Sequence, residues 1–323
     1  MLGLLLPQRA TAASGGFTPF GRVMEKSVYL YDSPSYQSTA LRSFNMDEVI
    51  SISGVEMGDK FPLYNQVWYQ ISGKGFIHST QLQPVRIKFN EPDAGIPAHG
   101  ILSEVTVPYT DARAKPLQNS EKEYRYYYAT THWIDKLVTD ANNQQWYRVM
   151  DDRDDNDKFY VPAEHLRVIS AEEIAPLSAE VPLHEKTIEV HASEQLMIAF
   201  EGDVPVLIAP VSLGDKGKNP RWRTPLGEFQ SFYKRPSRHM TAGNLAFGDY
   251  DLPGVPWVSY ITNWGIAFHG TYWHNDFGRP RSHGCINLPP ETAKWVYRWT
   301  QPEVPYDMQL KYQPGTGTKI TIV

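Results

Sequence analysis

Residues 265–288 carry the sequence GIAFHGTYWHNDFGRPRSHGCINL, and this stretch guides the interpretation of the whole chain. It contains the only cysteine of the protein, Cys285, and three of its ten histidines, His269, His274 and His283. Glycine follows His269 and separates His283 from Cys285. A sulfur nucleophile requires a nearby imidazole and room for a substrate carbonyl, and this stretch can supply both.

The segment that leads to His269 has the alternation of a β-strand. Ile266 and Phe268 fall on one face of such a strand, and the small residues Gly265 and Ala267 share the other face with His269. The large side chains are expected in the core. The small ones leave space in front of His269, as a substrate cleft requires.

The segment 282–285 has the composition of a nucleophile loop. Glycine beside a nucleophile lets the backbone approach a substrate closely, and amides of such a turn can stabilise an oxyanion. A free thiol has a reference pKa of about 8.5, so it needs a base or positive surroundings. The three histidines are candidate bases, and Arg279 and Arg281 add positive charge.

Three interpretations compete at this point. The first is an acyl-transfer enzyme with a cysteine and a histidine. The second is a buried cysteine, which behaves as a small hydrophobic residue. The third is a zinc site, because the three histidines and Cys285 are four residues of suitable types. Their spacing matches no familiar zinc pattern, so the residue types favour the enzyme, then the buried cysteine, then zinc.

Composition limits the remaining possibilities. A chain of 323 residues is long enough for two or three domains, and 41% hydrophobic with 13% aromatic residues indicates a folded protein. The net charge of −5 and the lack of a basic stripe predict no nucleic-acid partner. No apolar run has the length of a membrane span. A single cysteine excludes an internal disulfide.

The N-terminal tail, residues 1–19, has a feature of exported proteins. Leu2–Leu6 is an apolar patch, and alanines at positions 10, 12 and 13 resemble a cleavage site for a signal peptide. The tail is therefore interpreted as a signal remnant, or else as a frayed terminus. The first interpretation predicts an extracytoplasmic protein.

An internal repeat organises the first half of the chain. Residues 65–71 (NQVWYQI) match residues 143–149 (NQQWYRV), and residues 75–82 match residues 158–166. A period of roughly 80 residues in two copies indicates a duplicated domain. Short alternating runs between turn residues predict two small β units, residues 20–88 and 97–170.

Both units resemble bacterial SH3-like domains, and the resemblance implies small β-barrels that bind cell-wall peptide or glycan. We expect Trp68 and Trp146 in their cores. Tyr124 and the residues 126–128 are candidate binding residues on an outer face.

A linker, residues 171–184, precedes the third unit, residues 185–323. Alternating runs predict a β-meander at its start, and Gly, Asp and Pro predict a long loop over residues 236–254. A helix is expected over residues 289–299, with Thr292, Trp295, Val296 and Trp299 on its buried face.

The third unit resembles an L,D-transpeptidase catalytic domain. The resemblance rests on residues 211–214 (VSLG), residues 224–229 (TPLGEF), the pair His269-Gly270 and the motif of residues 282–288, SHGCINL. It implies a β-sandwich with one or two short helices, so the whole chain is expected to be mainly β. Papain-like wall peptidases place their cysteine before the histidine, and this chain has the opposite order.

The resemblance also implies roles for individual residues. Cys285 matches the nucleophile and His269 its base, and the carbonyl of Gly270 would fix the tautomer of His269. The amides around His283 and Gly284 match the oxyanion stabilisers. The expected substrate-binding residues are Ser282, Asn287, Arg281, Tyr272, Trp273 and His274.

The implied partner is a peptidoglycan stem peptide, with no cofactor and no metal. The expected reaction is a 3→3 cross-link formed through a cysteinyl thioester, in the cell wall or the periplasm. The alternatives are an L,D-carboxypeptidase or another wall peptidase that uses the same thiol, and a non-catalytic protein that binds the wall.

Overall fold

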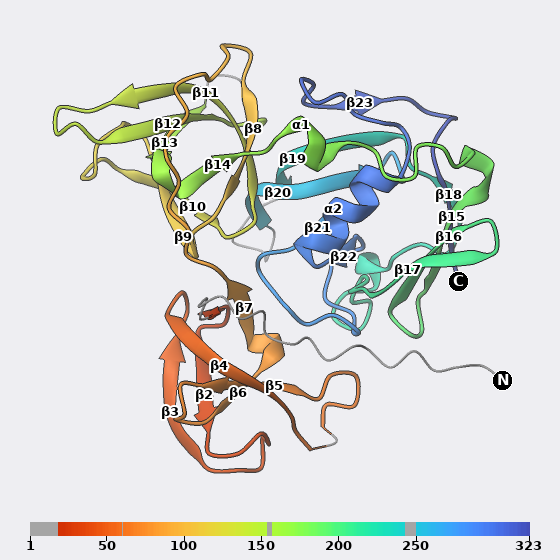
Figure 1. Ribbon diagram of the computed structural model, residues 1–323. Helices are drawn as coiled ribbons and strands as arrows, with labels where there is room; N and C mark the ends of the chain where they lie inside the picture. The colour runs from red at the N-terminus through yellow and green to blue at the C-terminus, as the bar shows by residue number, and fades with distance from the viewer. Residues whose placement is uncertain (1–18, 60, 154–156, 243–249) are drawn as a thin grey trace.

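The protein is mainly β and contains few helices, as the sequence predicted. A computed structural model describes residues 19–59, 61–153, 157–242 and 250–323, so the predicted signal remnant lies almost entirely outside the described residues. Figure 1 shows three β units, of which the first lies below the other two in this view.

The first unit is a seven-stranded sheet in the order β3-β2-β6-β5-β4-β1-β7. A 3₁₀ turn, η1 (Ser79–Gln81), precedes its last strand. The strands are β1 (Phe20–Val23), β2 (Ser27–Tyr31), β3 (Ala40–Asn45), β4 (Val49–Met57), β5 (Val67–Ile71), β6 (Phe76–His78) and β7 (Leu82–Val85).

The second unit repeats this topology. Its order is β10-β9-β13-β12-β11-β8-β14, which is the first order with every strand number raised by seven. Trp68 in β5 and Trp146 in β12 occupy equivalent strands and both are fully buried, as predicted. The strand pairings of the described residues leave both sheets open, so they do not bear out closed barrels. The strands are β8 (Ile101–Val105), β9 (Tyr109–Arg113), β10 (Lys122–Tyr127), β11 (Thr131–Thr139), β12 (Gln145–Met150), β13 (Lys158–Pro162) and β14 (Leu166–Val168), with η2 (Ala163–His165) before β14.

The third unit has two five-stranded sheets that enclose a common core. The first has the order β17-β16-β15-β24-β18 and the second β22-β21-β20-β19-β23. Ile188 and Met197 of the first sheet pack in one cluster with Trp257 and Phe268 of the second. The strands of the first sheet are β15 (Lys186–His191), β16 (Leu196–Glu201), β17 (Val204–Pro210), β18 (Gly227–Gln230) and β24 (Lys319–Ile322). Those of the second are β19 (Tyr233–Ala242), β20 (Tyr250–Tyr260), β21 (Ala267–Gly270), β22 (Ile286–Leu288) and β23 (Lys311–Tyr312).

Helix α2 (Pro290–Trp299) confirms the predicted helix and covers β20 and β21 (Figure 1). Proline at its first position suits a helix start, because the missing N–H has no partner there. Val296 and Trp299 are buried as expected, but Thr292 and Trp295 are only half-buried. Ala293 and Tyr297 are buried in their place, so the buried face is rotated from the predicted one. Trp295 instead stacks on Trp299, with ring centroids 5.2 Å apart.

The prediction of a long loop over residues 236–254 is wrong for residues 236–242 and 250–254, and residues 243–249 lie outside the described residues. Residues up to 242 continue β19, residues from 250 begin β20, and these two strands pair with each other. A register shift between Arg238 and Met240 accommodates the irregular sequence. Gly254 has a φ of 68°, and a Cβ atom there would lie 2.2 Å from the His132 ring of the second unit. The absence of a side chain at Gly254 therefore allows the second unit to pack closely against β20.

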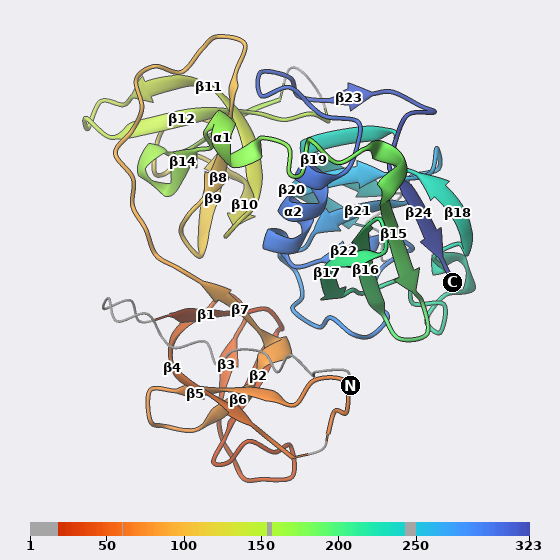
Figure 2. The same ribbon diagram turned by 45° about the vertical axis from the view of Figure 1, so that its right-hand side comes forward.

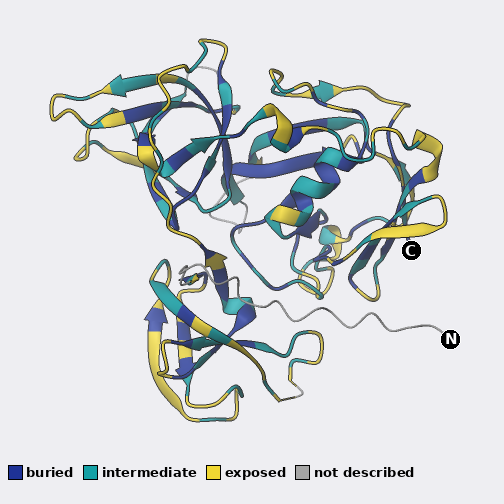
Figure 3. Ribbon diagram, in the orientation of Figure 1, coloured by how far each residue is buried: buried dark blue, intermediate teal, exposed yellow. Residues whose placement is uncertain are grey.

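The second and third units share one hydrophobic core. Leu102, Trp133 and Ile169 of the second unit belong to the main cluster of the third. The predicted linker also contributes, because a short helix, α1 (Ala171–Ile174), packs Ile174 into the same cluster. Further 3₁₀ turns are η3 (Leu183–Glu185) and η4 (Pro220–Trp222). Figure 2 shows the second unit beside the end of β19 and β20, and Figure 3 shows that β20 is mostly buried while β17 is exposed.

Candidate active site

Two adjacent parallel strands bring the predicted nucleophile and base together. In the pairing of β21 with β22, Phe268 lies opposite Ile286 and His269 opposite Asn287. Cys285 directly precedes β22, so its position is opposite Ala267. Because partners in a parallel pair face the same side, Cys285, Ala267 and His269 share one face of the sheet. Ile266 and Phe268 pack into the main core, as the alternation predicted.

His269 is a buried, neutral imidazole with a fixed tautomer. Its Nδ1 lies 3.0 Å from the carbonyl oxygen of Gly270. A carbonyl can only accept, so Nδ1 carries the proton and Nε2 is left as the basic nitrogen. Burial lowers the pKa of His269 to about 4. A Cβ atom at Gly270 would lie 2.8 Å from Pro256, so only glycine fits beside the histidine.

The Cys285 thiol is half-buried and neutral. Its Sγ donates to the carbonyl oxygen of Gly265 across 3.4 Å. Burial raises the pKa of Cys285 to about 11. At neutral pH both groups are therefore uncharged, a thiol at Cys285 and a neutral imidazole at His269.

Ser282 holds the nucleophile loop in shape. Its hydroxyl donates to the carbonyl of Cys285 at 2.6 Å and accepts the amide N–H of Gly284 at 3.0 Å. Gly284 has a φ of 128°, and its carbonyl accepts the hydroxyl of Thr224 at 2.8 Å. The Gly284 amide N–H is thus bonded to Ser282, and its predicted role as an oxyanion stabiliser stays a prediction. Ser282 itself lines the cavity in front of the thiol.

A cavity of about 290 Å³ opens in front of the thiol and the imidazole. Seven of the predicted site residues line it: His269, Trp273, Arg281, Ser282, His283, Cys285 and Asn287. Met240, Tyr250 and Leu252 complete the wall. The sequence prediction missed Met240 and Leu252 because it assigned their segment to a loop, although both are apolar residues in a largely polar stretch. Tyr250 was a candidate for the oxyanion or the substrate but was left out of the predicted site. The ring of His283 stacks on Tyr250 with centroids 5.4 Å apart.

The comparison with protein families agrees with this geometry. Residues 185–322 match the family model of the L,D-transpeptidase catalytic domain. The third unit is an L,D-transpeptidase catalytic domain.

Solved L,D-transpeptidases are similar to parts of the chain. A mutant enzyme from Enterococcus faecium is 22% identical, the match covers 43% of this chain and 50% of that chain, and the TM-score is 0.33. The enzyme from Mycobacterium smegmatis is 19% identical over 60% of this chain and 89% of that chain, with a TM-score of 0.35. L,D-transpeptidase 3 from Mycobacterium tuberculosis is 18% identical, the match covers 52% of this chain and 75% of that chain, and the TM-score is 0.32. The chain spans about half the length of the first solved structures that it matches. A comparison with curated proteins gives no match.

Two residues predicted to bind substrate in this L,D-transpeptidase domain lie outside the cavity. His274 is buried behind Asn287, with Nε2 2.9 Å from the amide of Asn287, and its Nδ1 accepts the backbone N–H of Asp276. Burial lowers its pKa to about 3, so it is neutral and supports Asn287. The expected position of His274 on the cleft rim is wrong.

Tyr272 instead marks the point where all three units meet. Its ring stacks on Tyr127 of the second unit at 5.2 Å, and its carbonyl accepts Nη2 of Arg22 from the first unit at 2.5 Å. Its hydroxyl donates to the carbonyl of Pro253. The prediction that Tyr272 binds substrate is therefore wrong, because these partners bury it.

A tyrosine hydroxyl of the first unit bonds a carboxylate that supports the cavity wall. Asp276 accepts the hydroxyl of Tyr64 at 2.6 Å and pairs with Arg279 at 2.7 Å and Arg281 at 3.5 Å. Arg281 lines the cavity, so this carboxylate balances part of its charge and fixes its position. A segment of the first unit thereby supports the catalytic domain.

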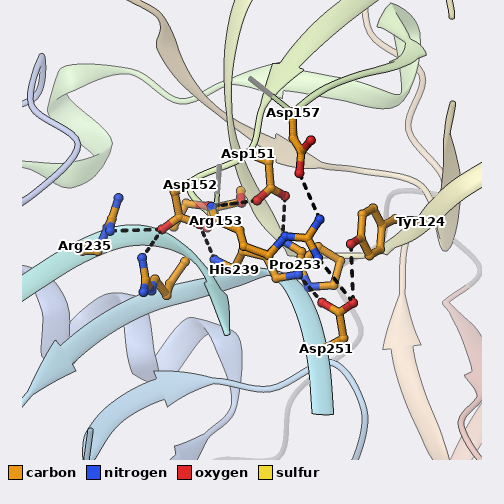
Figure 4. A network of polar contacts seen from close by, with 12 residues as sticks. Tyr124, Asp151, Asp152, Arg153, Asp157, Arg235, His239, Asp251 and Pro253 are labelled. Carbon is orange, nitrogen blue, oxygen red and sulfur yellow. Dashed lines mark hydrogen bonds and ion pairs between the residues drawn. The ribbon is translucent and has the colours of Figure 1, made fainter. Parts of the chain in front are cut away.

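The second unit holds the hairpin of β19 and β20 through a buried polar network (Figure 4). His239 of β19 lies between the carboxylates of Asp151 and Asp251 and contacts both. Asp152 accepts the backbone N–H of His239 at 2.6 Å. Asp152 forms ion pairs with Arg235 and Arg238. Arg153 forms ion pairs with Asp157 and Asp251. The hydroxyl of Tyr124 donates to Asp251. The same hairpin carries Met240 and Leu252 into the cavity, so the network supports the cavity wall.

Within the described ranges, no three His, Cys, Asp or Glu side chains are grouped closely enough to hold a metal ion. No helix of the described residues is long and apolar enough to cross a membrane.

Proposed function

We propose that the protein is a peptidoglycan L,D-transpeptidase that forms 3→3 cross-links through a thioester on Cys285. The observation that carries the proposal is the position of Cys285 and His269 on one face of two paired strands, at the wall of a cavity. The carbonyl of Gly270 leaves Nε2 of His269 as the proton acceptor.

The first half-reaction would acylate the cysteine. His269 takes the thiol proton as Sγ attacks the carbonyl of the third residue in a stem tetrapeptide. When the tetrahedral intermediate collapses, its C–N bond breaks, and His269 returns the proton to the amine of the departing D-Ala. Arg281 supplies positive charge toward a stem carboxylate.

The second half-reaction would transfer the acyl group. The amine of a second stem attacks the thioester, loses a proton to His269, and the regenerated sulfur recovers that proton. An amide joins the third residues of two stems. The low pKa of His269 and the high pKa of Cys285 keep both groups neutral until a substrate is bound.

The proposal includes the two N-terminal units and the location. Their shared strand order supports a duplicated SH3-like domain that contacts cell-wall glycan or peptide. Peptidoglycan lies outside the cytoplasm, so the protein would act in the cell wall or the periplasm.

Incubation with a disaccharide tetrapeptide tests the function. The wild-type protein should give a 3→3 dimer and release D-Ala, and Cys285→Ala should give neither. Release of D-Ala without dimer would identify a carboxypeptidase, and equal behaviour of both proteins would reject the thiol mechanism.

A further inference from the structure

A row of tyrosines crosses the catalytic sheet in register with the nucleophile. Cys285 is opposite Ala267, Ala267 pairs with Tyr260, Tyr260 with Tyr233, and Tyr233 with Tyr312. Directly opposed residues of neighbouring strands face the same side of a sheet. The five residues therefore line one face of the sheet, from β22 to the edge strand β23.

Ring contacts agree with this register. Tyr260 and Tyr233 stack with centroids 5.0 Å apart and planes inclined by 13°. Tyr233 and Tyr312 lie 6.0 Å apart at 64°. At the other end of the row, Tyr260 and Cys285 pack against the same small hydrophobic cluster, which includes Ala267. The row thus runs from the cluster that contains Cys285 to the edge of the sheet.

The row opens to solvent at its outer end. Tyr260 and Tyr233 are half-buried, whereas 59% of Tyr312 is exposed. Figure 1 shows β23 at the border of the unit, beside β19. Nη1 of Arg235 donates to the hydroxyl of Tyr233 at 3.2 Å, so polar groups accompany the rings. Aromatic faces beside hydroxyl and guanidinium groups suit a pyranose ring, which has an apolar face of C–H groups and a rim of hydroxyls.

The spacing along the row matches the length of a stem peptide. Neighbouring strands lie about 4.8 Å apart, which places Tyr233 about 14 Å and Tyr312 about 19 Å from the strand of Cys285. Three extended residues span at most about 11 Å, and the ether linkage to the sugar adds a few ångström more. A stem joined to Cys285 through the carbonyl of its third residue therefore brings its own sugar to the outer half of the row.

We infer that Tyr233 and Tyr312 form a glycan subsite for the amino sugar that carries the donor stem. This inference rests on the proposed function, because it assumes that the stem is attached to Cys285. Tyr260 lies beneath the intervening peptide. The subsite predicts that the enzyme distinguishes a disaccharide tetrapeptide from the free tetrapeptide.

The test compares both substrates on the full-length chain. Tyr312→Ser should raise KM for the disaccharide tetrapeptide about fivefold, leave kcat unchanged, and leave KM for the free tetrapeptide unchanged. Tyr312→Phe should behave as the wild type because it keeps the ring. The control is Ile208→Ser, since Ile208 is 60% exposed on the other sheet of the same domain.

Equilibrium binding to Cys285→Ala, with and without Tyr312→Ser, gives a second readout that needs no turnover. A fivefold weaker Kd for the disaccharide tetrapeptide alone supports the subsite. The subsite is overturned if Kd rises equally for both ligands or does not change. It is also overturned if Ile208→Ser weakens binding of the disaccharide tetrapeptide by the same factor. A wild-type protein that binds the disaccharide through Tyr312 but forms no product would reject the proposed function and retain the subsite.

Discussion

The strongest stability prediction concerns His239 at the contact between the second unit and the catalytic domain. Its two ring nitrogens contact carboxylates, Nδ1 facing Asp151 at 2.6 Å and Nε2 facing Asp251. Carboxylates accept, so both nitrogens donate and the ring is an imidazolium. The His239 side chain is 1% exposed and that of Asp151 is 4% exposed, so the pair is shielded from water.

Substitution of His239 by methionine should cost about 3–5 kcal/mol in the free energy of unfolding, because it leaves Asp151 buried without its cation. Urea unfolding at several pH values measures this change. His184→Met is the matched control, since the His184 side chain is 82% exposed, and it should change stability by less than about 0.5 kcal/mol.

The pH dependence follows from the two pKa shifts. Burial lowers the pKa of His239, but the bonds and charges of Asp151 and Asp251 outweigh it, so the net pKa lies above 6.5. The stabilisation by His239 is complete below its unfolded pKa and is lost as pH rises through the folded one. Burial raises the pKa of Asp151, but contacts with His239 bring it below 3.8, so its contribution is lost as pH falls through that lower value.

The difference between wild type and His239→Met should therefore be largest between about pH 4 and pH 6.5 and smaller at both extremes. A difference below about 1 kcal/mol, or one that does not vary with pH, would refute the assignment of a buried imidazolium.

Three further predictions concern the site and its support. As pH falls, kcat/KM should decrease with a midpoint near pH 4, because burial lowers the pKa of His269 to about 4 and only the neutral ring accepts a proton. A midpoint at pH 6.5 in the pH profile would contradict this. Gly270→Ala should lower the free energy of unfolding by about 1–3 kcal/mol in thermal denaturation, because its methyl group would lie 2.8 Å from the ring of Pro256. An unchanged Tm would contradict the close packing. Tyr64→Phe should lower the free energy of unfolding in urea by about 1.5 kcal/mol, because it removes a 2.6 Å hydrogen bond to Asp276. The control Tyr29→Phe, at a side chain that is 51% exposed, should change it little, and equal losses would count against the contact.

The sequence predicted that Cys285 and His269 lie together because the pattern behind this prediction is local. The alternation around His269 and the glycines beside Cys285 lie in one stretch of 24 residues, and pairing of β21 with β22 brings their two ends together. The buried Trp68 and Trp146 were also predictable, because equivalent positions of a repeat share one environment.

The remaining features depend on contacts between units, which no local pattern reveals. Tyr272 meets Arg22 across 250 positions of sequence, and this contact turns a candidate substrate residue into a structural one. The segment 236–254 has the composition of a loop, yet residues 236–242 and 250–254 pair as strands, and His239 and Gly254 among them contact the second unit. His274 differs because its partner, Asn287, belongs to the same unit, but the tertiary fold still has to place the two residues side by side.

The central claim is that Cys285 forms a thioester with a stem peptide, and intact-mass spectrometry tests it most directly. After brief exposure of the wild-type protein to a stem tetrapeptide, the account predicts an adduct equal to the mass of the tetrapeptide less alanine, absent from Cys285→Ala. Absence of this adduct in the wild type despite turnover of the tetrapeptide, or its presence on Cys285→Ala, would contradict the account.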